Sequence, residues 1–292
     1  MSTVPRYLRG LVDDAAIFPP GCAELSQAVT DHGGYRRSWY ADMVGPLVVR
    51  DTDLAEVARL VERVETTPNL GVVVSGGAGA LASGARLAHR LGQHVAQYEI
   101  AVRDLDDPAG NARRVVAAYD TAAADDLVAD ETHVYVELPQ ADVSANWLAA
   151  ADVVAEAGHR LKFRTGGLDA DLVPSPARLA GWLEAALDRE ASFKCTAGLH
   201  HPVRHRDDAL GAWQHGFLNV LLATHATLDG ADVGSVERVL SEHDPGVLLA
   251  DLRGLGDDAL VSARRWFASY GSCSVHEPLD DLIDLDLMEG PR

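Results

Sequence analysis

The sequence predicts an α/β protein built as a closed (β/α)8 TIM-type barrel, and three observations lead to that class. Short runs rich in Val, Ile and Leu alternate with longer segments whose apolar residues recur at helical spacing. Strands that alternate with helices pair in parallel through right-handed crossovers. Seven such units are clear and an eighth follows with looser spacing, which favours a closed barrel over an open doubly wound sheet. We therefore expect one domain over 1–292, with a looser helical insertion at about 203–246.

The predicted elements follow one another in a regular order. Strands are expected at residues 8–18 (a strand with its loop), 46–49, 70–74, 94–102, 133–138, 160–165, 192–197 and 270–275. Helices are expected at 24–43 with a break at Gly33-Gly34, and at 53–64, 80–91, 108–123, 143–157, 176–189, 211–227, 235–243 and 257–268; residues 199–208 should be a polar loop, and 247–251 a strand or a helix end. Gly158 suits a helix C-terminus, and Pro174-Ser175-Pro176 supplies an N-cap and an N1 proline.

The composition excludes several classes of partner. A formal net charge of −19 argues against nucleic acid or an anionic membrane, because both require a basic surface. No apolar run reaches the ~20 residues of a membrane helix. The three cysteines lack metal spacing and fit free thiols in a reducing compartment, so a cytoplasmic protein is expected. A small-molecule substrate is the expected partner, and a homo-oligomer is left open.

Lysine is used in an unusual way. The chain has 25 Lys plus Arg, yet lysine occurs only at 162 and 194, in the similar stretches Leu161-Lys162-Phe163-Arg164-Thr165-Gly166-Gly167 and Phe193-Lys194-Cys195-Thr196-Ala197-Gly198. A buried lysine can lose its proton and act as a nucleophile, whereas arginine cannot. Two lysines at matched positions of neighbouring strands therefore suggest amine chemistry.

The twofold period of a strand predicts which side chains share the barrel interior. Lys162 shares a face with Arg164, Lys194 shares one with Thr196, and the other predicted pairs are Gln97 with Glu99 and Tyr135 with Glu137. So many buried ionisable groups are costly unless they pair or serve a site. They could form a salt-bridge network that plugs the barrel. Alternatively, Lys194 and Arg164 could lower the pKa of Lys162, so that a neutral amine adds to a carbonyl.

These motifs resemble the deoxyribose-phosphate aldolase group of class I aldolase barrels over about residues 94–200. The resemblance implies that Lys162 is the Schiff-base lysine and Lys194 the lysine that lowers its pKa. It places Gln97 or Glu99 near the family's acid on the fourth strand, and Glu137 near its glutamate on the fifth.

One departure from that family concerns the substrate. The family has a Gly-Gly pair in its phosphate-binding turn after the seventh strand, where this chain reads Gly198-Leu199-His200-His201-Pro202. This turn cannot approach a phosphate as closely. A non-phosphorylated substrate is therefore expected.

Two histidines and an aspartate complete the candidate site. His200 or His201, after the seventh strand, could be a general acid or base. Either could instead bind zinc or manganese together with Glu137, Glu99 or Asp14. Asp14 lies near the end of the first strand and could also accept a hydrogen bond from a substrate hydroxyl.

Three functions remain open on the sequence alone. The leading one is a cofactor-independent aldolase-type lyase acting on a small carbonyl or hydroxy compound. Its candidate catalytic residues are Lys162, Lys194, Glu137, Glu99 and His200, and its candidate substrate-binding residues are Arg164, Thr196, His201, Asp14 and Gln97. The second is a metal-dependent lyase, isomerase or hydrolase that uses His200 and Glu137, with the lysines binding a substrate anion. The third is a non-catalytic barrel with structural lysines.

Overall fold

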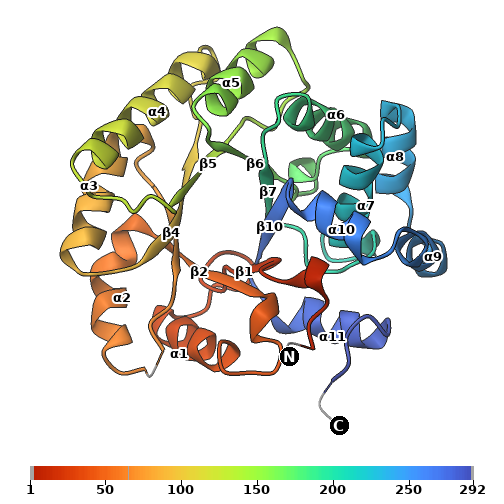
Figure 1. The fold of residues 1–292 in the computed structure, drawn as a ribbon, viewed down its shortest axis with the longest axis horizontal. Coiled ribbons are helices and arrows are strands. Elements are labelled where there is room, and N and C mark those ends of the chain that lie inside the picture. The colour runs from red at the N-terminus through yellow and green to blue at the C-terminus, as the bar shows by residue number, and fades with distance from the viewer. Residues whose placement is uncertain (1–2, 65, 291–292) are drawn as a thin grey trace.

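A computed structural model describes residues 3–64 and 66–290 and confirms the barrel (Figure 1). Eight parallel strands close in the order β1-β10-β7-β6-β5-β4-β3-β2. They are β1 (Val12–Asp14), β2 (Val44–Arg50), β3 (Leu70–Val73), β4 (Val95–Ala101), β5 (His133–Glu137), β6 (Arg160–Arg164), β7 (Phe193–Thr196) and β10 (Phe267–Ser272). Strands two to seven pair with their neighbours in chain order, so side chains far apart in the sequence meet inside the barrel.

The helices form an outer ring around the sheet (Figure 1). They are α1 (Leu25–Tyr35), α2 (Leu54–Val61), α3 (Ala78–Arg90), α4 (Pro108–Ala124), α5 (Ala145–Glu156), α6 (Pro176–Leu187), α7 (Phe217–Leu228), α8 (Val233–Ser241), α9 (Pro245–Leu255), α10 (Asp257–Arg264) and α11 (His276–Asp284). Gly158 adopts a positive φ of 70° just after α5, and the Ser175 side chain accepts a hydrogen bond from the backbone N–H of Arg178 at the start of α6. Both boundary predictions are confirmed.

The structure corrects several predicted boundaries. Helix α1 continues through Gly33 and Gly34, because neither glycine adopts a left-handed conformation. It ends at Tyr35, eight residues before the predicted end at 43. The first strand is only three residues long. The helix predicted over 257–268 stops at Arg264, and the last strand begins at Phe267, three residues before the predicted start at 270. Residues 247–251 lie within α9.

A small hairpin replaces part of the expected loop and helix after β7. Its strands, β8 (His205–Asp207) and β9 (Ala212–Gln214), pair antiparallel, so the helix predicted over 211–227 begins only at Phe217. Asp207 accepts hydrogen bonds from the backbone N–H groups of Ala209 and Leu210, which stabilises the turn. This hairpin stands next to the end of β7, where the site is found.

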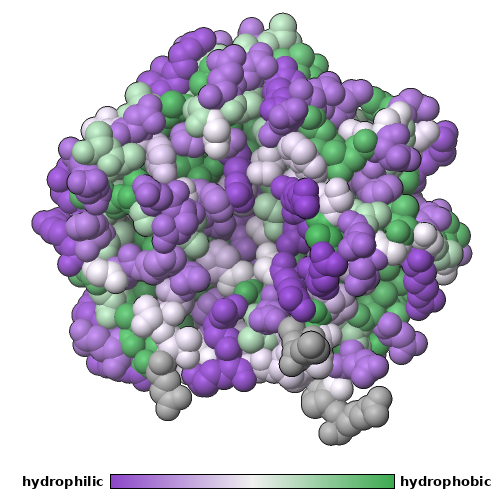
Figure 2. Space-filling view, viewed as in Figure 1, coloured by the Kyte–Doolittle hydropathy of each residue, from purple (hydrophilic) through white to green (hydrophobic). Residues whose placement is uncertain are grey.

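The packed core lies between the sheet and the helices. Leu161 and Phe163 of β6 and Cys195 of β7 point outward into it, and the Phe163 ring lies 5.6 Å from the ring of Trp182 on α6. Outward residues of the strands are thus apolar, and the alternate, inward residues are free to be polar. Hydrophilic side chains dominate the face in Figure 2, with apolar ones scattered between them. Within the described residues no helix is both long and apolar enough to cross a membrane.

Candidate active site

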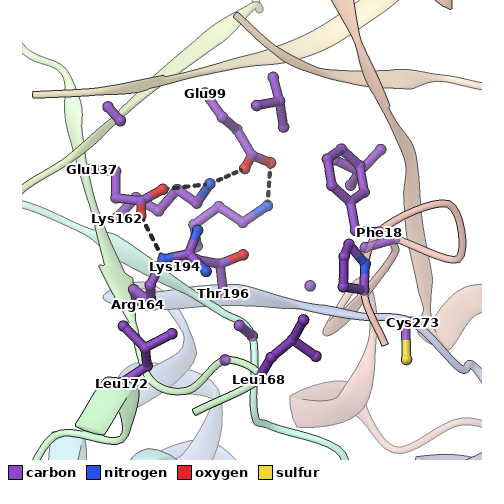
Figure 3. A pocket seen from close by; sticks show the side chains of 18 of the residues that line it. Phe18, Glu99, Glu137, Lys162, Arg164, Leu168, Leu172, Lys194, Thr196 and Cys273 are labelled. Atoms are coloured by element: carbon purple, nitrogen blue, oxygen red, sulfur yellow. Dashed lines mark hydrogen bonds and ion pairs between the residues drawn. The ribbon is translucent and has the colours of Figure 1, made fainter. Parts of the chain in front are cut away.

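A cavity of about 450 Å³ lies at the carboxyl ends of the barrel strands, and both lysines line it. Lys162 and Lys194 are direct neighbours in the register of β6 and β7, so their side chains enter the barrel side by side. Glu99 from β4 receives both: its Oε2 lies 2.7 Å from Nζ of Lys162 and its Oε1 lies 2.7 Å from Nζ of Lys194 (Figure 3). One carboxylate therefore bridges the two amines.

Each lysine has a further carboxylate partner. The Nζ of Lys162 lies 2.9 Å from Oε2 of Glu137, whose other oxygen accepts a 3.0 Å hydrogen bond from Nε of Arg164 (Figure 3). The Nζ of Lys194 pairs with Oδ2 of Asp13 on β1. Three cations and three carboxylates thus form one connected cluster. Such a cluster can remain in the barrel interior because every charge has a partner.

The deep end of the cluster is fully enclosed. Oδ2 of Asp13 also accepts hydrogen bonds from Nε2 of Gln97 at 2.9 Å and from the Ser269 hydroxyl at 3.0 Å. Gln97 also donates to Glu99 at 3.0 Å. Gln97 therefore lies below the lysines and orients the carboxylates, away from the cavity wall.

The mouth of the cavity is more open. Arg164 is 37% exposed, and it lines the cavity together with Thr196 and His200. Nδ1 of His200 lies 2.7 Å from a carboxylate oxygen of Glu277 on α11, and its Nε2 lies 3.9 Å from Sγ of Cys273. If Glu277 accepts the proton on Nδ1, the lone pair is on Nε2, beside Cys273, which also lines the cavity; a neutral imidazole of this kind can act as a general base.

The carboxylates of the cluster raise the pKa values of both lysines, whereas the sequence predicted a lowered pKa for Lys162. Burial lowers the pKa of Lys162, but Glu137 and Glu99 outweigh burial and the nearby Lys194, so the pKa is raised. The pKa of Lys194 is also raised, because Asp13 and Glu99 outweigh its burial. The prediction that Lys162 has a lowered pKa is therefore wrong for the unliganded site. The prediction of a lowered pKa rested on burial and the neighbouring cations, whereas the salt-bridge alternative, with glutamates facing the lysines, predicts the observed direction.

The carboxylates shift the opposite way. Burial raises the pKa of Glu99, but the charges of Lys162 and Lys194 and their hydrogen bonds outweigh it and lower the pKa to about 2. For Glu137, Lys162 and Arg164 likewise outweigh burial and lower the pKa. Lys162 and Glu137 are thus both charged at neutral pH in the free protein.

Three residues predicted to bind substrate do not line the cavity: Gln97, which is held by Asp13 and Glu99, and also Asp14 and His201. Asp14 points outward, where its Oδ2 lies 3.0 Å from Nδ1 of buried His32 on α1. His201 turns toward α11, where its Nδ1 lies 2.6 Å from Asp281, and it lines an adjoining groove of about 360 Å³. The inward aspartate is Asp13. Sequence reasoning missed it because a three-residue strand gives too short a pattern to decide which of two adjacent aspartates faces the barrel.

The residues proposed for a metal have other partners. Glu137 is held by Lys162 and Arg164, and His200 by Glu277. Across residues 3–64 and 66–290, no three His, Cys, Asp or Glu side chains converge as metal ligands. The pairing of His200 and Glu137 on one ion is therefore not preformed.

The comparisons with known proteins concern the fold. No protein-family model matches the chain, and a comparison with curated proteins gives no match. A tetrameric deoxyribose phosphate aldolase from Aeropyrum pernix is similar over 96% of this chain and 93% of its own, with a TM-score of 0.55 and 14% identity. Two structures from Toxoplasma gondii ME49, assigned as deoxyribose-phosphate aldolase, match 96% of this chain and 95% and 92% of theirs, with TM-scores of 0.51 and 0.52 and 13% identity. The resemblance noted in the lysine motifs thus extends to a shared barrel fold.

Proposed function

We propose that this protein is a carbon–carbon lyase of the class I aldolase type, in which Lys162 forms a Schiff base with a small, non-phosphorylated carbonyl compound. The observation that carries the proposal is the position of the Lys162 amine. Nζ of Lys162 stands at a cavity of substrate size, within hydrogen-bond distance of two carboxylates that can take and return protons. The fold shared with deoxyribose-phosphate aldolases supports the same choice.

The first step requires that Lys162 lose a proton. Burial already favours the neutral forms of both Lys162 and Glu137, and only their mutual attraction and their other charged neighbours keep them ionised. A substrate that displaces water from the cavity increases the burial, so it favours transfer of the proton across the 2.9 Å hydrogen bond to Glu137. Glu137 is the better acceptor because it faces the mouth, whereas Glu99 remains held by Lys194.

The neutral amine then attacks the carbonyl carbon. The carbonyl oxygen takes up two protons in all and leaves as water, and the nitrogen keeps one proton in a positively charged iminium ion. Glu137 returns the proton that it accepted, so the ammonium and the carbonyl give the iminium and one water. Lys194 stays protonated and holds Glu99 in place.

The carbon–carbon bond breaks next. A base removes the proton of the hydroxyl on the β carbon, the bond between the α and β carbons breaks, and its electron pair moves to the iminium nitrogen to give an enamine. His200 at the mouth is placed to act as that base, oriented by Glu277. Protonation of the enamine carbon and addition of water then release the second carbonyl product and restore Lys162.

The mouth of the cavity favours a substrate without phosphate. Gly198 lies against Gly166, where a Cβ would come within 2.7 Å of the Gly198 Cα, so these glycines serve the packing of two turns. Glu277 occupies the first turn of α11 beside His200 and would repel a dianion. We therefore assign a non-phosphorylated substrate.

A reductive trapping experiment tests the proposal. The protein is incubated with a panel of small aldehydes and ketones and then with sodium cyanoborohydride, and the peptides that contain each lysine are analysed by mass. We expect a stable adduct on Lys162 and none in Lys162→Met. If no carbonyl of a broad panel labels Lys162 while the protein remains folded, the Schiff-base proposal is wrong.

One observation favours a second candidate, a non-catalytic barrel. Every charge of the cluster has a partner, and the pKa values of both lysines are raised, as expected for purely structural ion pairs. In that case Lys162→Met changes the free energy of unfolding and nothing else. The trapping experiment separates the two candidates, because a structural lysine gives no adduct.

A further inference from the structure

Two guanidinium groups at the cavity lack a full set of partners. Arg164 donates from Nε to Glu137, but its two terminal nitrogens make no hydrogen bond to any residue in 3–64 or 66–290. Arg103, which follows β4, lines the same cavity, and its side chain has no hydrogen bond or ion pair within those ranges. Arginine donates through a planar fork that matches the two oxygens of a carboxylate.

The distance from Arg164 to the amine limits what can bind both. The Glu137 carboxylate contacts Nζ of Lys162 at 2.9 Å and Nε of Arg164 at 3.0 Å, so the two nitrogens are at most about 8 Å apart. Lys162 and Arg164 also lie two residues apart on the inward face of β6. A molecule attached to Lys162 through its carbonyl carbon therefore reaches Arg164 with a group only a few bonds away.

The cationic groups that are free to bind an anion lie at the mouth of the cavity. Lys162, Lys194, Arg103 and Arg164 line the wall together with the carboxylates of Glu99, Glu137 and Asp169. Asp13 pairs with Lys194 from behind, so four cations face four carboxylates and the site is neutral overall. The two lysines are held by carboxylates, whereas the Arg103 side chain and the terminal nitrogens of Arg164 make no hydrogen bond within residues 3–64 and 66–290, so an anion can bind them.

We infer that the carbonyl substrate carries a carboxylate, which the terminal nitrogens of Arg164 bind, with Arg103 as a second cation at the mouth. The substrate class is then an oxo acid whose carboxylate is bonded to the carbonyl carbon or lies one or two carbons from it. This inference rests on the proposed Schiff base at Lys162. A carboxylate is favoured over a phosphate because Nε of Arg164 already donates to Glu137. The two terminal nitrogens remain, and this planar pair of donors matches the two oxygens of a carboxylate.

Pyruvate and its uncharged isostere pyruvamide form a matched pair of probes. Both are titrated in the presence of cyanoborohydride, and the concentration that gives half-maximal labelling of Lys162 is measured. We expect pyruvate to require a concentration about ten- to a hundredfold lower, as for a charge-assisted pair of hydrogen bonds. Arg164→Gln should abolish this preference, Arg164→Lys should retain part of it, and Arg103→Gln should reduce it.

The controls keep the test decisive. Arg178→Gln removes an arginine that pairs with Asp142 outside the cavity, and it should leave the preference unchanged. Equal labelling by both probes, a preference that survives in Arg164→Gln, or displacement of pyruvate by equimolar inorganic phosphate would each overturn the inference while leaving the Schiff base intact. If neither probe labels Lys162 but another carbonyl of the panel does, the inference is overturned and the Schiff base stands; if no carbonyl labels it, the proposed function fails. Calorimetry of pyruvate binding then tests the carboxylate site separately. If pyruvate binds the protein and does not bind Arg164→Gln, the carboxylate site is supported; if pyruvate does not bind the protein at all, the inference is wrong.

Discussion

The surroundings of the two lysines differ although their sequence motifs are alike. Lys194 is 1% exposed and shares its two carboxylates with Gln97 and Ser269 at the closed end of the cluster. Lys162 is 5% exposed and shares one carboxylate with Arg164 at the open end. The difference teaches that adjacent, equivalent strand positions can have different tasks. Under the proposed function, Lys194 holds the cluster together and Lys162 meets the substrate.

The largest expected effect is on stability. Lys194→Met leaves Asp13 without a cationic partner in the closed end, so we expect a loss of about 3–5 kcal/mol in the free energy of unfolding. Lys162→Met should cost less, about 1–3 kcal/mol, because Glu99 keeps Lys194 and Glu137 keeps Arg164. Urea denaturation measures both, with Arg178→Gln as a surface control that should stay within about 0.5 kcal/mol. Equal losses for the two lysines would break the distinction between them.

Acid should weaken the cluster through Glu99. Its pKa falls from 4.5 in the unfolded chain to about 2 in the fold, so the unfolded chain binds this proton more tightly. Stability from this group is therefore present above about pH 4.5 and is lost as the pH falls toward 2, by roughly 3 kcal/mol. Glu99→Gln should flatten this part of the stability profile. An unchanged profile in the variant would show that Glu99 is not the bridge between the lysines.

The open end can be tested without loss of the fold. His200→Asn should lower turnover about a hundredfold or more, as expected for loss of a general base, with the urea midpoint nearly unchanged. Glu277→Gln should lower it less, because the carboxylate orients His200 and takes no part in the proton transfer itself. Full activity of His200→Asn would assign the proton transfer to Glu137 instead.

The smallest effect is expected at the outward aspartate. Asp14→Asn should leave adduct formation on Lys162 unchanged and should cost about 1 kcal/mol of stability, because its partner is His32 on the far side of β1. Asp13→Asn removes a partner of Lys194 and should cost more. The two variants are measured by the same urea series and the same labelling. A loss of labelling in Asp14→Asn would contradict the assignment of the inward face.

The sequence predicted the middle of the barrel well because its strands have clear periods. Residues 133–138, 160–165 and 192–197 lie between strong helical patterns, and their twofold period placed Lys162, Arg164 and Lys194 inside the barrel. Figure 3 shows these side chains converging as expected. Each of these strands faces the barrel interior on one side and the helices on the other, so shifting it by one residue would exchange its polar and apolar side chains between the two sides.

Other features depend on contacts that no local pattern contains. The partners of Lys194 come from β1 and β4, so the direction of its pKa shift depends on strands 181 and 95 residues away. The hairpin over 205–214 mixes polar residues with Leu210 and Trp213 and shows no helical or strand period. The sequence predicts too late a start for the last strand, because Trp266 and Phe267 continue the apolar pattern of the preceding helix and so fall within the predicted helix.

Nuclear magnetic resonance of ¹⁵N-labelled lysine tests the central claim most directly. The chain has only two lysines, so the spectrum has only two Nζ signals, assigned by Lys162→Met. In the free protein at neutral pH, both should be ammonium signals, because the pKa values of both lysines are raised. When a carbonyl substrate is added, we predict that the Lys162 signal moves to the iminium range while Lys194 remains ammonium. Two unchanged ammonium signals in the presence of a bound carbonyl compound would contradict the account.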